Sequence, residues 1–76
     1  MVDEYPGLCR DTNGGNPDEK FIGKFSQKVE CVKECIRLRG TGCVYDRTSN
    51  GGGCWFVTWN VVKGDGNPSY ACMKLT

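Results

Sequence analysis

The sequence contains no histidine, and this absence removes the side chain that most often acts as a general base or as a zinc ligand. The nine carboxylates show no pairing typical of acid and base catalysis, and no phosphate-binding glycine motif is present. A zinc site is also unexpected, because the chain has no Cys-x2-Cys pair. We therefore expect a protein that is not an enzyme, binds no metal and needs no cofactor.

No apolar run approaches the roughly 18 residues of a membrane span. Residues 1–6 have neither the basic segment nor the apolar run of a signal peptide, so secretion would mean that a signal has been removed or that Met1 is an expression start. At 76 residues there is room for a single domain, 1–76. Hydrophobic residues make up 38% of the chain, which is low for a self-sufficient core. Another source of stability is therefore required.

The net charge of +1 gives the chain a weak overall field, which disfavours nucleic acid as a partner. Basic residues do gather in one segment, but acidic residues are interspersed with them. The basic residues are Lys24, Lys28, Lys33, Arg37 and Arg39, and the acidic ones are Asp18, Glu19, Glu30 and Glu34. A solvated helix face is the favoured interpretation. A site for a heparin-like polyanion is the alternative.

The chain contains six cysteines. They are Cys9, Cys31, Cys35, Cys43, Cys54 and Cys72. An even number of cysteines at uneven spacing in a short chain is typical of a disulfide framework. Three disulfides at roughly 2–4 kcal/mol each would stabilise so small a domain. Because disulfides persist in oxidising compartments, we expect a secreted or cell-surface protein that unfolds when it is reduced.

Apolar periodicity and turn residues predict one helix and several strands. Segment 27–39 is predicted as a helix, with Ser26 as its N-cap and with Gly40 and Gly42 ending it. The predicted strands are 21–25, a strand starting at 44–46, 54–62 and 70–75. The predicted loops and turns are 5–20, 48–53 and 63–68.

The order of the cysteines along these elements is distinctive. The predicted helix carries Cys31-Val-Lys-Glu-Cys35, a glycine-containing link reaches Cys43, and Cys54 begins an aromatic strand. Cys72 follows near the C-terminus, in Ser69-Tyr-Ala-Cys-Met-Lys74. This order resembles the PAN/apple domain family and the related leech antiplatelet and collagen-binding proteins, and the resemblance extends from Cys9 to Leu75.

The resemblance implies an α+β fold, in which an antiparallel sheet of about four or five strands cradles the helix. It also implies the disulfides Cys9–Cys72, Cys31–Cys54 and Cys35–Cys43, whereas the sequence by itself leaves fifteen pairings open. The family uses protein and carbohydrate ligands, so the resemblance implies an extracellular, lectin-like or adhesive binding module. The alternatives are a secreted antagonist of platelet or cell adhesion that binds collagen or integrin, and a diffusible signal or toxin on the same scaffold.

The tryptophans of the predicted aromatic strand are the first candidates for ligand binding. Side chains alternate along a strand, so Trp55, Val57 and Trp59 point to the face opposite Cys54. If Cys54 bonds the helix, this aromatic row faces away from the helix. It would then bind sugar rings, a protein or a second copy of the chain. Alternatively, a loop such as residues 5–20 covers it as a second small core.

The tripeptide Lys63-Gly-Asp65 is the second candidate. It resembles the Lys-Gly-Asp variant of the integrin-binding tripeptide of disintegrins. A carboxylate at the tip of a turn would reach an integrin-bound metal ion, and the nearby cation would meet an acidic pocket. The alternative is a plain glycine-rich turn, because Gly, Asp, Asn and Pro are the residues that turns require.

Overall fold

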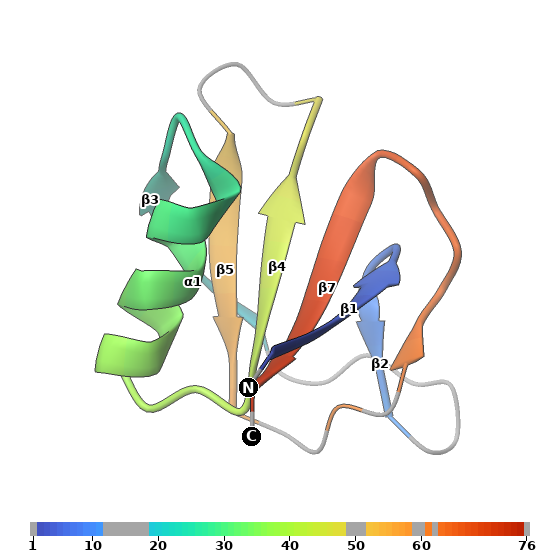
Figure 1. The fold of residues 1–76 in the computed structure, drawn as a ribbon, viewed down its shortest axis with the longest axis horizontal. Coiled ribbons are helices and arrows are strands. Elements are labelled where there is room, and N and C mark those ends of the chain that lie inside the picture. Colours follow the sequence, from blue (N-terminus) through green and yellow to red (C-terminus); the bar gives the residue numbers. More distant parts are fainter. Residues whose placement is uncertain (1, 12–18, 49–51, 59–60, 62, 76) are drawn as a thin grey trace.

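The structure, a computed structural model, describes residues 2–11, 19–48, 52–58, 61 and 63–75. Within these ranges the chain forms one helix and seven strands (Figure 1). In chain order they are β1 (Val2–Pro6), β2 (Cys9–Arg10), β3 (Glu19–Lys24), α1 (Lys28–Arg37), β4 (Gly42–Asp46), β5 (Gly53–Val57), β6 (Lys63–Gly64) and β7 (Tyr70–Leu75).

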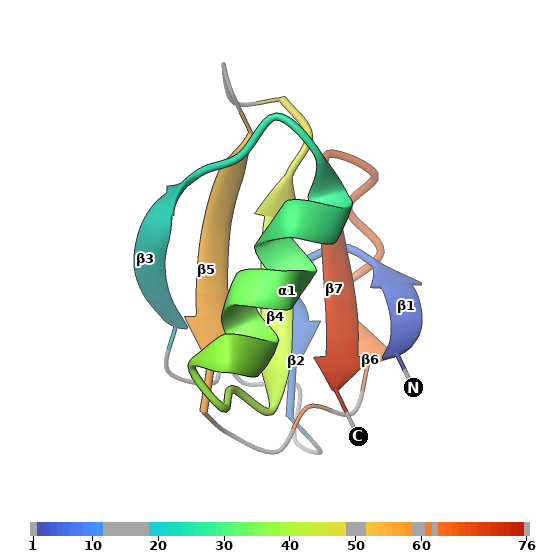
Figure 2. The same cartoon turned by 60° about the vertical axis from the view of Figure 1, so that its left-hand side comes forward.

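Five of the strands form one antiparallel sheet in the order β1-β7-β4-β5-β3, and β2 pairs with β6 in a second, two-stranded sheet. The helix α1 lies over β4 and β5 on one face of the large sheet, while β2 and β6 lie behind it (Figure 2). The expected α+β architecture with one helix on an antiparallel sheet is therefore confirmed. Among the described residues, no helix is long and apolar enough to cross a membrane.

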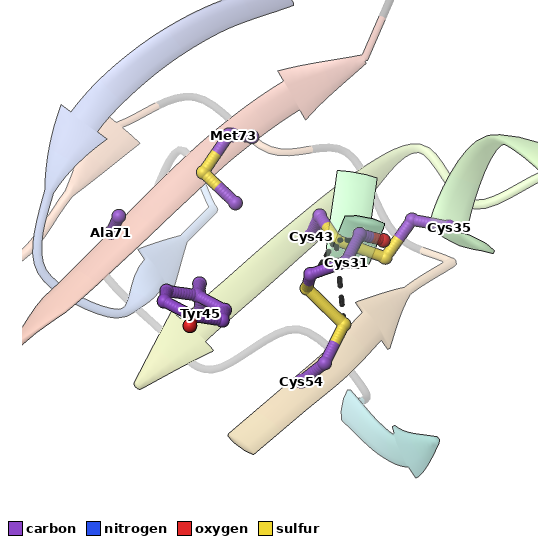
Figure 3. Packing of buried hydrophobic residues seen from close by; sticks show 7 residues of the cluster. All are labelled: Cys31, Cys35, Cys43, Tyr45, Cys54, Ala71 and Met73. Atoms are coloured by element: carbon purple, nitrogen blue, oxygen red, sulfur yellow. Dashed lines mark hydrogen bonds between the residues drawn. A yellow bond between two sulfur atoms is a disulfide. The ribbon is translucent and has the colours of Figure 1, made fainter. Parts of the chain in front are cut away.

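The core between α1 and the sheet is small and rich in sulfur (Figure 3). Its buried members are Cys31, Cys35, Cys43, Tyr45, Cys54, Ala71 and Met73. The Tyr45 hydroxyl donates a hydrogen bond of 2.9 Å to the Phe25 carbonyl, which satisfies the polar end of the ring at the edge of the core. Because cysteines take so many of these positions, the core depends on its cross-links as much as on hydrophobic burial.

The three disulfides are Cys9–Cys72, Cys31–Cys54 and Cys35–Cys43, the pairs that the family resemblance implies. Cys31 and Cys35 are one helical turn apart, so both point from α1 toward the sheet. Cys31 bonds to Cys54 on β5 and Cys35 bonds to Cys43 on β4, so the helix is fixed to the sheet at two points. Cys9–Cys72 lies on the opposite face and closes a sequence separation of 63 residues.

The N-terminal segment differs from the prediction of a loop over residues 5–20. Val2–Pro6 forms the outer strand β1, which pairs with β7 so that Tyr5 lies opposite Cys72, and Cys9–Arg10 forms β2. Pro6 is tolerated there because it ends an outer strand, where a missing N–H leaves no neighbour unpaired. Residues 12–18 lie outside the described part of the chain.

The aromatic strand predicted over 54–62 corresponds to β5, which ends at Val57, and residues 59–60 and 62 of the prediction lie outside the described part of the chain. The backbone N–H and the hydroxyl of Thr41 both donate to the Val57 carbonyl, at 2.7 and 3.1 Å. The Val57 carbonyl is therefore hydrogen-bonded to Thr41, which lies in the link between α1 and β4. The predicted turn at 63–68 is also shorter, because Lys63–Gly64 forms β6.

The ends of α1 differ from the predicted helix 27–39. Gln27, rather than Ser26, is the N-cap residue, and it makes no side-chain capping hydrogen bond. At the other end Arg39, rather than a glycine, takes the left-handed conformation with φ of 61°. Gly40 is needed for close packing instead, because a Cβ there would lie 3.1 Å from the Val57 carbonyl oxygen. Gly42 belongs to β4.

Truncation of Met73 tests the helix-side core. Met73 is almost fully buried on β7, and Met73→Ala is expected to lower the free energy of unfolding by about 2–5 kcal/mol. Chemical denaturation of the oxidised protein measures this change. Val29→Ala is the control, because Val29 is exposed on α1 and its change should stay within about 0.5 kcal/mol. Equal losses for the two variants would contradict this description of the core.

Candidate functional site

The sheet face opposite α1 carries a row of side chains that crosses all five strands. The strand register places Phe21 beside Trp55, Trp55 beside Val44, Val44 beside Cys72, and Cys72 beside Tyr5. This is the face to which the sequence analysis assigns the tryptophans. It divides into a covered part, under β2 and β6, and an open part at the outer strand β3.

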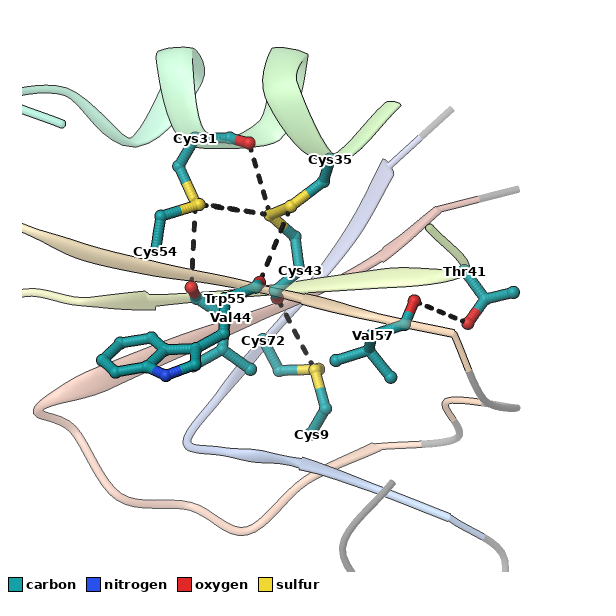
Figure 4. Close-up of a disulfide and its surroundings, with 10 residues drawn as sticks. All are labelled: Cys9, Cys31, Cys35, Thr41, Cys43, Val44, Cys54, Trp55, Val57 and Cys72. Atoms are coloured by element: carbon teal, nitrogen blue, oxygen red, sulfur yellow. Dashed lines mark hydrogen bonds between the residues drawn. A yellow bond between two sulfur atoms is a disulfide. The ribbon is translucent and has the colours of Figure 1, made fainter. Parts of the chain in front are cut away.

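The covered part is a second small core. Its buried members are Cys9, Val44, Val57, Val61 and Cys72. The Cys9–Cys72 disulfide holds β2 against this part of the sheet, below the sheet in Figure 4. Val57 is fully buried here, so it is removed from the ligand-binding residues that the sequence analysis names. The N-terminal strand β2 therefore covers the part of this face near β7, in keeping with the interpretation that a segment within residues 5–20 lies over it.

The open part is an aromatic pair, which we call the aromatic edge and define as Phe21 and Trp55. Their ring centroids are 5.2 Å apart with an interplanar angle of 60°, an edge-to-face arrangement. Trp55 is half-buried, and a Cβ at Gly53 would lie 2.8 Å from its ring, so the missing side chain leaves room for the indole. Phe21 is 55% exposed. Trp59, the other tryptophan of the prediction, lies outside the described residues.

Sequence reasoning misses Phe21 as a member of this site. Its strand was predicted, but its position beside Trp55 depends on the register between β3 and β5. That register shifts between Phe21 and Gly23, where the pairing is irregular. The aromatic edge therefore becomes visible only when the two strands are paired.

The carboxylate of Asp65 accepts hydrogen bonds from its own loop and from the N-terminal segment. Its Oδ1 accepts hydrogen bonds of 2.9 Å from the backbone N–H groups of Leu8 and Asn67, and its Oδ2 accepts one of 3.1 Å from Arg10. Gly7, with φ of 103°, allows this approach, because a Cβ there would overlap Asp65 Oδ1. The Asn67 N–H is the largest cause that lowers the pKa of Asp65, and the Leu8 N–H and the Arg10 charge lower it further against partial desolvation.

These contacts bear directly on the Lys63-Gly-Asp65 candidate. Lys63 is exposed, but with Gly64 it pairs with β2 rather than forming the tip of a turn. Asp65 links the two ends of the chain, since its N–H also donates to the Leu8 carbonyl at 3.0 Å. The arrangement favours the interpretation of this tripeptide as a structural turn. These hydrogen bonds hold the carboxylate toward the N-terminal segment and its own loop.

Glu19 is an ionisable residue to which the sequence analysis gives no site role. It begins β3 opposite Val57, and its Oε1 is buried without a hydrogen-bond partner within the described structure. Desolvation raises its pKa, the nearby Arg10 opposes this shift, and the charge of Asp65 adds to it. The sequence gives no indication that Glu19 is partly buried, because this burial depends on how the strands pack in the fold.

The basic segment around α1 is partly paired with acidic side chains. Lys28 Nζ lies 2.6 Å from Glu4 Oε1, and Glu4 also binds Arg47 at 3.1 Å. Arg37 forms an ion pair with Glu34, three residues earlier on the same helix. These pairs favour the interpretation of a solvated helix face over that of a polyanion site.

Comparisons with known proteins add no family assignment: no protein-family model, curated protein or solved structure matches the chain. The resemblance to PAN/apple domains therefore rests on cysteine order and on the order of the helix and strands.

Replacement of Asp65 tests its role in the loop. The folded state lowers the pKa of this carboxyl below its ordinary value of 3.8, so its stabilising effect is complete above that pH and is lost as the pH falls through the lower, folded pKa. Asp65→Asn should therefore melt at a lower temperature than the wild type near neutral pH. The difference should shrink below pH 3.8.

Thermal melting at a series of pH values measures this difference, with Asp3→Asn on the outer strand β1 as the control. The Asp3→Asn protein should melt close to the wild type throughout. A pH-independent difference for Asp65→Asn would show that the charge of Asp65 is not what holds the loop.

Replacement of Glu19 should have the opposite sign. Because burial raises the pKa of Glu19 above its ordinary value of 4.5, the charged form destabilises the fold at neutral pH, and stability is regained as the pH falls toward 4.5. Glu19→Gln should therefore raise the melting temperature at pH 7, with less gain at acidic pH. Glu30→Gln on the exposed side of α1 is the control, and a lower melting temperature for Glu19→Gln would show that pairing with Arg10 outweighs desolvation.

Proposed function

We propose that this protein is an extracellular, non-catalytic binding module of the PAN/apple type. Three disulfides are consistent with an extracellular location. The one-helix sheet and the nested disulfide pairs support the resemblance on which the module type rests. The absence of histidine supports a function by binding rather than by catalysis.

The proposed ligand site is the aromatic edge, and the observation that carries it is the exposure of Phe21. A phenylalanine that is 55% exposed on a strand keeps a large apolar surface in water. Its contact with the half-buried Trp55 limits the positions that its ring can take, so little side-chain entropy is lost on binding. Rigid aromatic side chains of this kind are typical anchors of protein interfaces.

A protein ligand is favoured over a carbohydrate by the geometry of the two rings. At an interplanar angle of 60° the rings do not form one flat platform on which neighbouring sugars would stack. The projecting Phe21 ring instead suits an apolar pocket on a partner. The adhesion-antagonist alternative loses the support of the Lys63-Gly-Asp65 motif, because the Asp65 carboxylate is already bonded within the chain.

A matched pair of surface variants tests the proposal. Phe21 and Ile36 are each 55% exposed, but Phe21 lies on β3 and Ile36 on α1. In a binding screen against collagens, integrin ectodomains, other extracellular proteins and glycans, Phe21→Ser should weaken binding to a protein ligand roughly tenfold or more. Ile36→Ser should bind as the wild type does.

The outcomes separate the alternatives. Glycan binding that free sugar competes and that Phe21→Ser abolishes would replace the protein ligand by a carbohydrate. Integrin binding lost with Asp65→Ala at an unchanged melting temperature would restore the antagonist hypothesis. Equal affinity of Phe21→Ser and wild type for a confirmed ligand would place the site away from the aromatic edge.

A further inference from the structure

The two disulfides under α1 lie sulfur against sulfur. Cys31 Sγ is 3.3 Å from Cys43 Sγ, and Cys43 Sγ is 4.0 Å from Cys54 Sγ, although neither pair is bonded. With Cys35 Sγ, the four sulfurs all lie within 4.8 Å of one another and all four residues are buried. Figure 4 shows them together between the helix and the sheet. They form one cluster, which we call the sulfur cluster.

Two separations in the sulfur cluster are close to those of a tetrathiolate metal site. A tetrahedral Zn²⁺ ion binds thiolate sulfur at about 2.3 Å, which places neighbouring sulfurs about 3.8 Å apart. Two of the four unbonded separations, 3.3 and 4.0 Å, lie on either side of that value, and the other two are at most 4.8 Å. In a reduced, metal-bound chain the two bonded pairs would have to move apart toward the same separation.

The elements that supply the sulfurs also suit a metal site. Cys31 and Cys35 come from one face of α1, and Cys43 and Cys54 come from the adjacent strands β4 and β5. Four ligands are therefore held by one helical turn and one strand pair. The sequence lacks a Cys-x2-Cys pair, so this arrangement depends on the packing of the helix against the sheet.

We propose that the reduced chain binds one soft divalent ion of the Zn²⁺ class at Cys31, Cys35, Cys43 and Cys54. In the oxidised protein all six cysteines are in disulfides, so no thiolate is offered to a metal. The ion and the two disulfides are thus alternative cross-links at one place in the fold. The ion would hold α1 to β4 and β5 under reducing conditions, and the disulfides hold it under oxidising conditions.

A phosphine reductant and one water molecule convert each disulfide into two thiols and one phosphine oxide. The four thiols of the sulfur cluster then release four protons as they bind the ion. Metal binding should weaken as the pH falls, because protons compete with the ion for the thiolates. Carbonyl oxygens within 3.7 Å of the sulfurs would add to this effect, since they would accept hydrogen bonds from the thiols. A disulfide oxidant would reverse the process and release the ion.

Metal binding and folding should be coupled. A small domain that loses three disulfides is expected to unfold, and a structural metal can then supply the missing stability. The test uses the full chain, reduced with a phosphine and titrated with Co²⁺ and then Zn²⁺. The expected result is one Co²⁺ per chain with the thiolate charge-transfer and visible bands of a tetrahedral site, displaced by Zn²⁺. Dispersed amide signals should return in the NMR spectrum as the metal is added.

Paired serine variants provide the controls. Cys9→Ser/Cys72→Ser leaves the sulfur cluster intact and should keep the tetrathiolate spectrum of cobalt. Cys35→Ser/Cys43→Ser removes two ligands and should lose that spectrum. Equal cobalt spectra for the two double variants would overturn the proposal, and so would tetrathiolate binding to a chain whose amide signals stay collapsed.

Discussion

The contact between two disulfides beneath α1 is the constraint on which the rest of the structure depends. Cys31 and Cys35 leave the same side of the helix and bond to two adjacent strands, so the helix has no freedom to slide or to turn on the sheet. The apolar residues around them are few, and Tyr45 and Met73 are the largest buried side chains of that core. Covalent bonds thus supply the rigidity that a larger domain obtains from packing.

The attachment of α1 to one face of the sheet determines which side chains lie on the other face. With α1 fixed on one side, side-chain alternation directs Trp55 and Val57 to the opposite side. The Cys9–Cys72 disulfide brings β2 over β4 and β7 on that side, and Val57 is buried in the same cluster of residues. Phe21 on the outer strand β3 and Trp55 on the neighbouring β5 stay partly exposed. One sheet face thus combines a closed half with an open edge, and the open edge is where we propose that a ligand binds.

Features encoded over a short stretch of sequence are predictable here, and those that join distant parts of the chain are not. The apolar stripe of α1 predicts the helix, and the fold class follows from the resemblance of the cysteine order to PAN/apple domains. The outer strand β1 has no alternation to reveal it and depends on β7 at the other end of the chain. The bonds from Asp65 to Leu8 and Arg10, and the contact of Phe21 with Trp55, also require partners that no local pattern identifies.

The most direct test of this account is the disulfide map of the native, oxidised protein. Tryptic sites at Lys33, Arg37, Arg47 and Lys63 separate the cysteines of the sulfur cluster from one another and from Cys72, so each bonded pair gives its own peptide mass. The account predicts only the pairs Cys9–Cys72, Cys31–Cys54 and Cys35–Cys43. A Cys31–Cys35 link would contradict it, because the helix would then be joined to itself and not to the sheet.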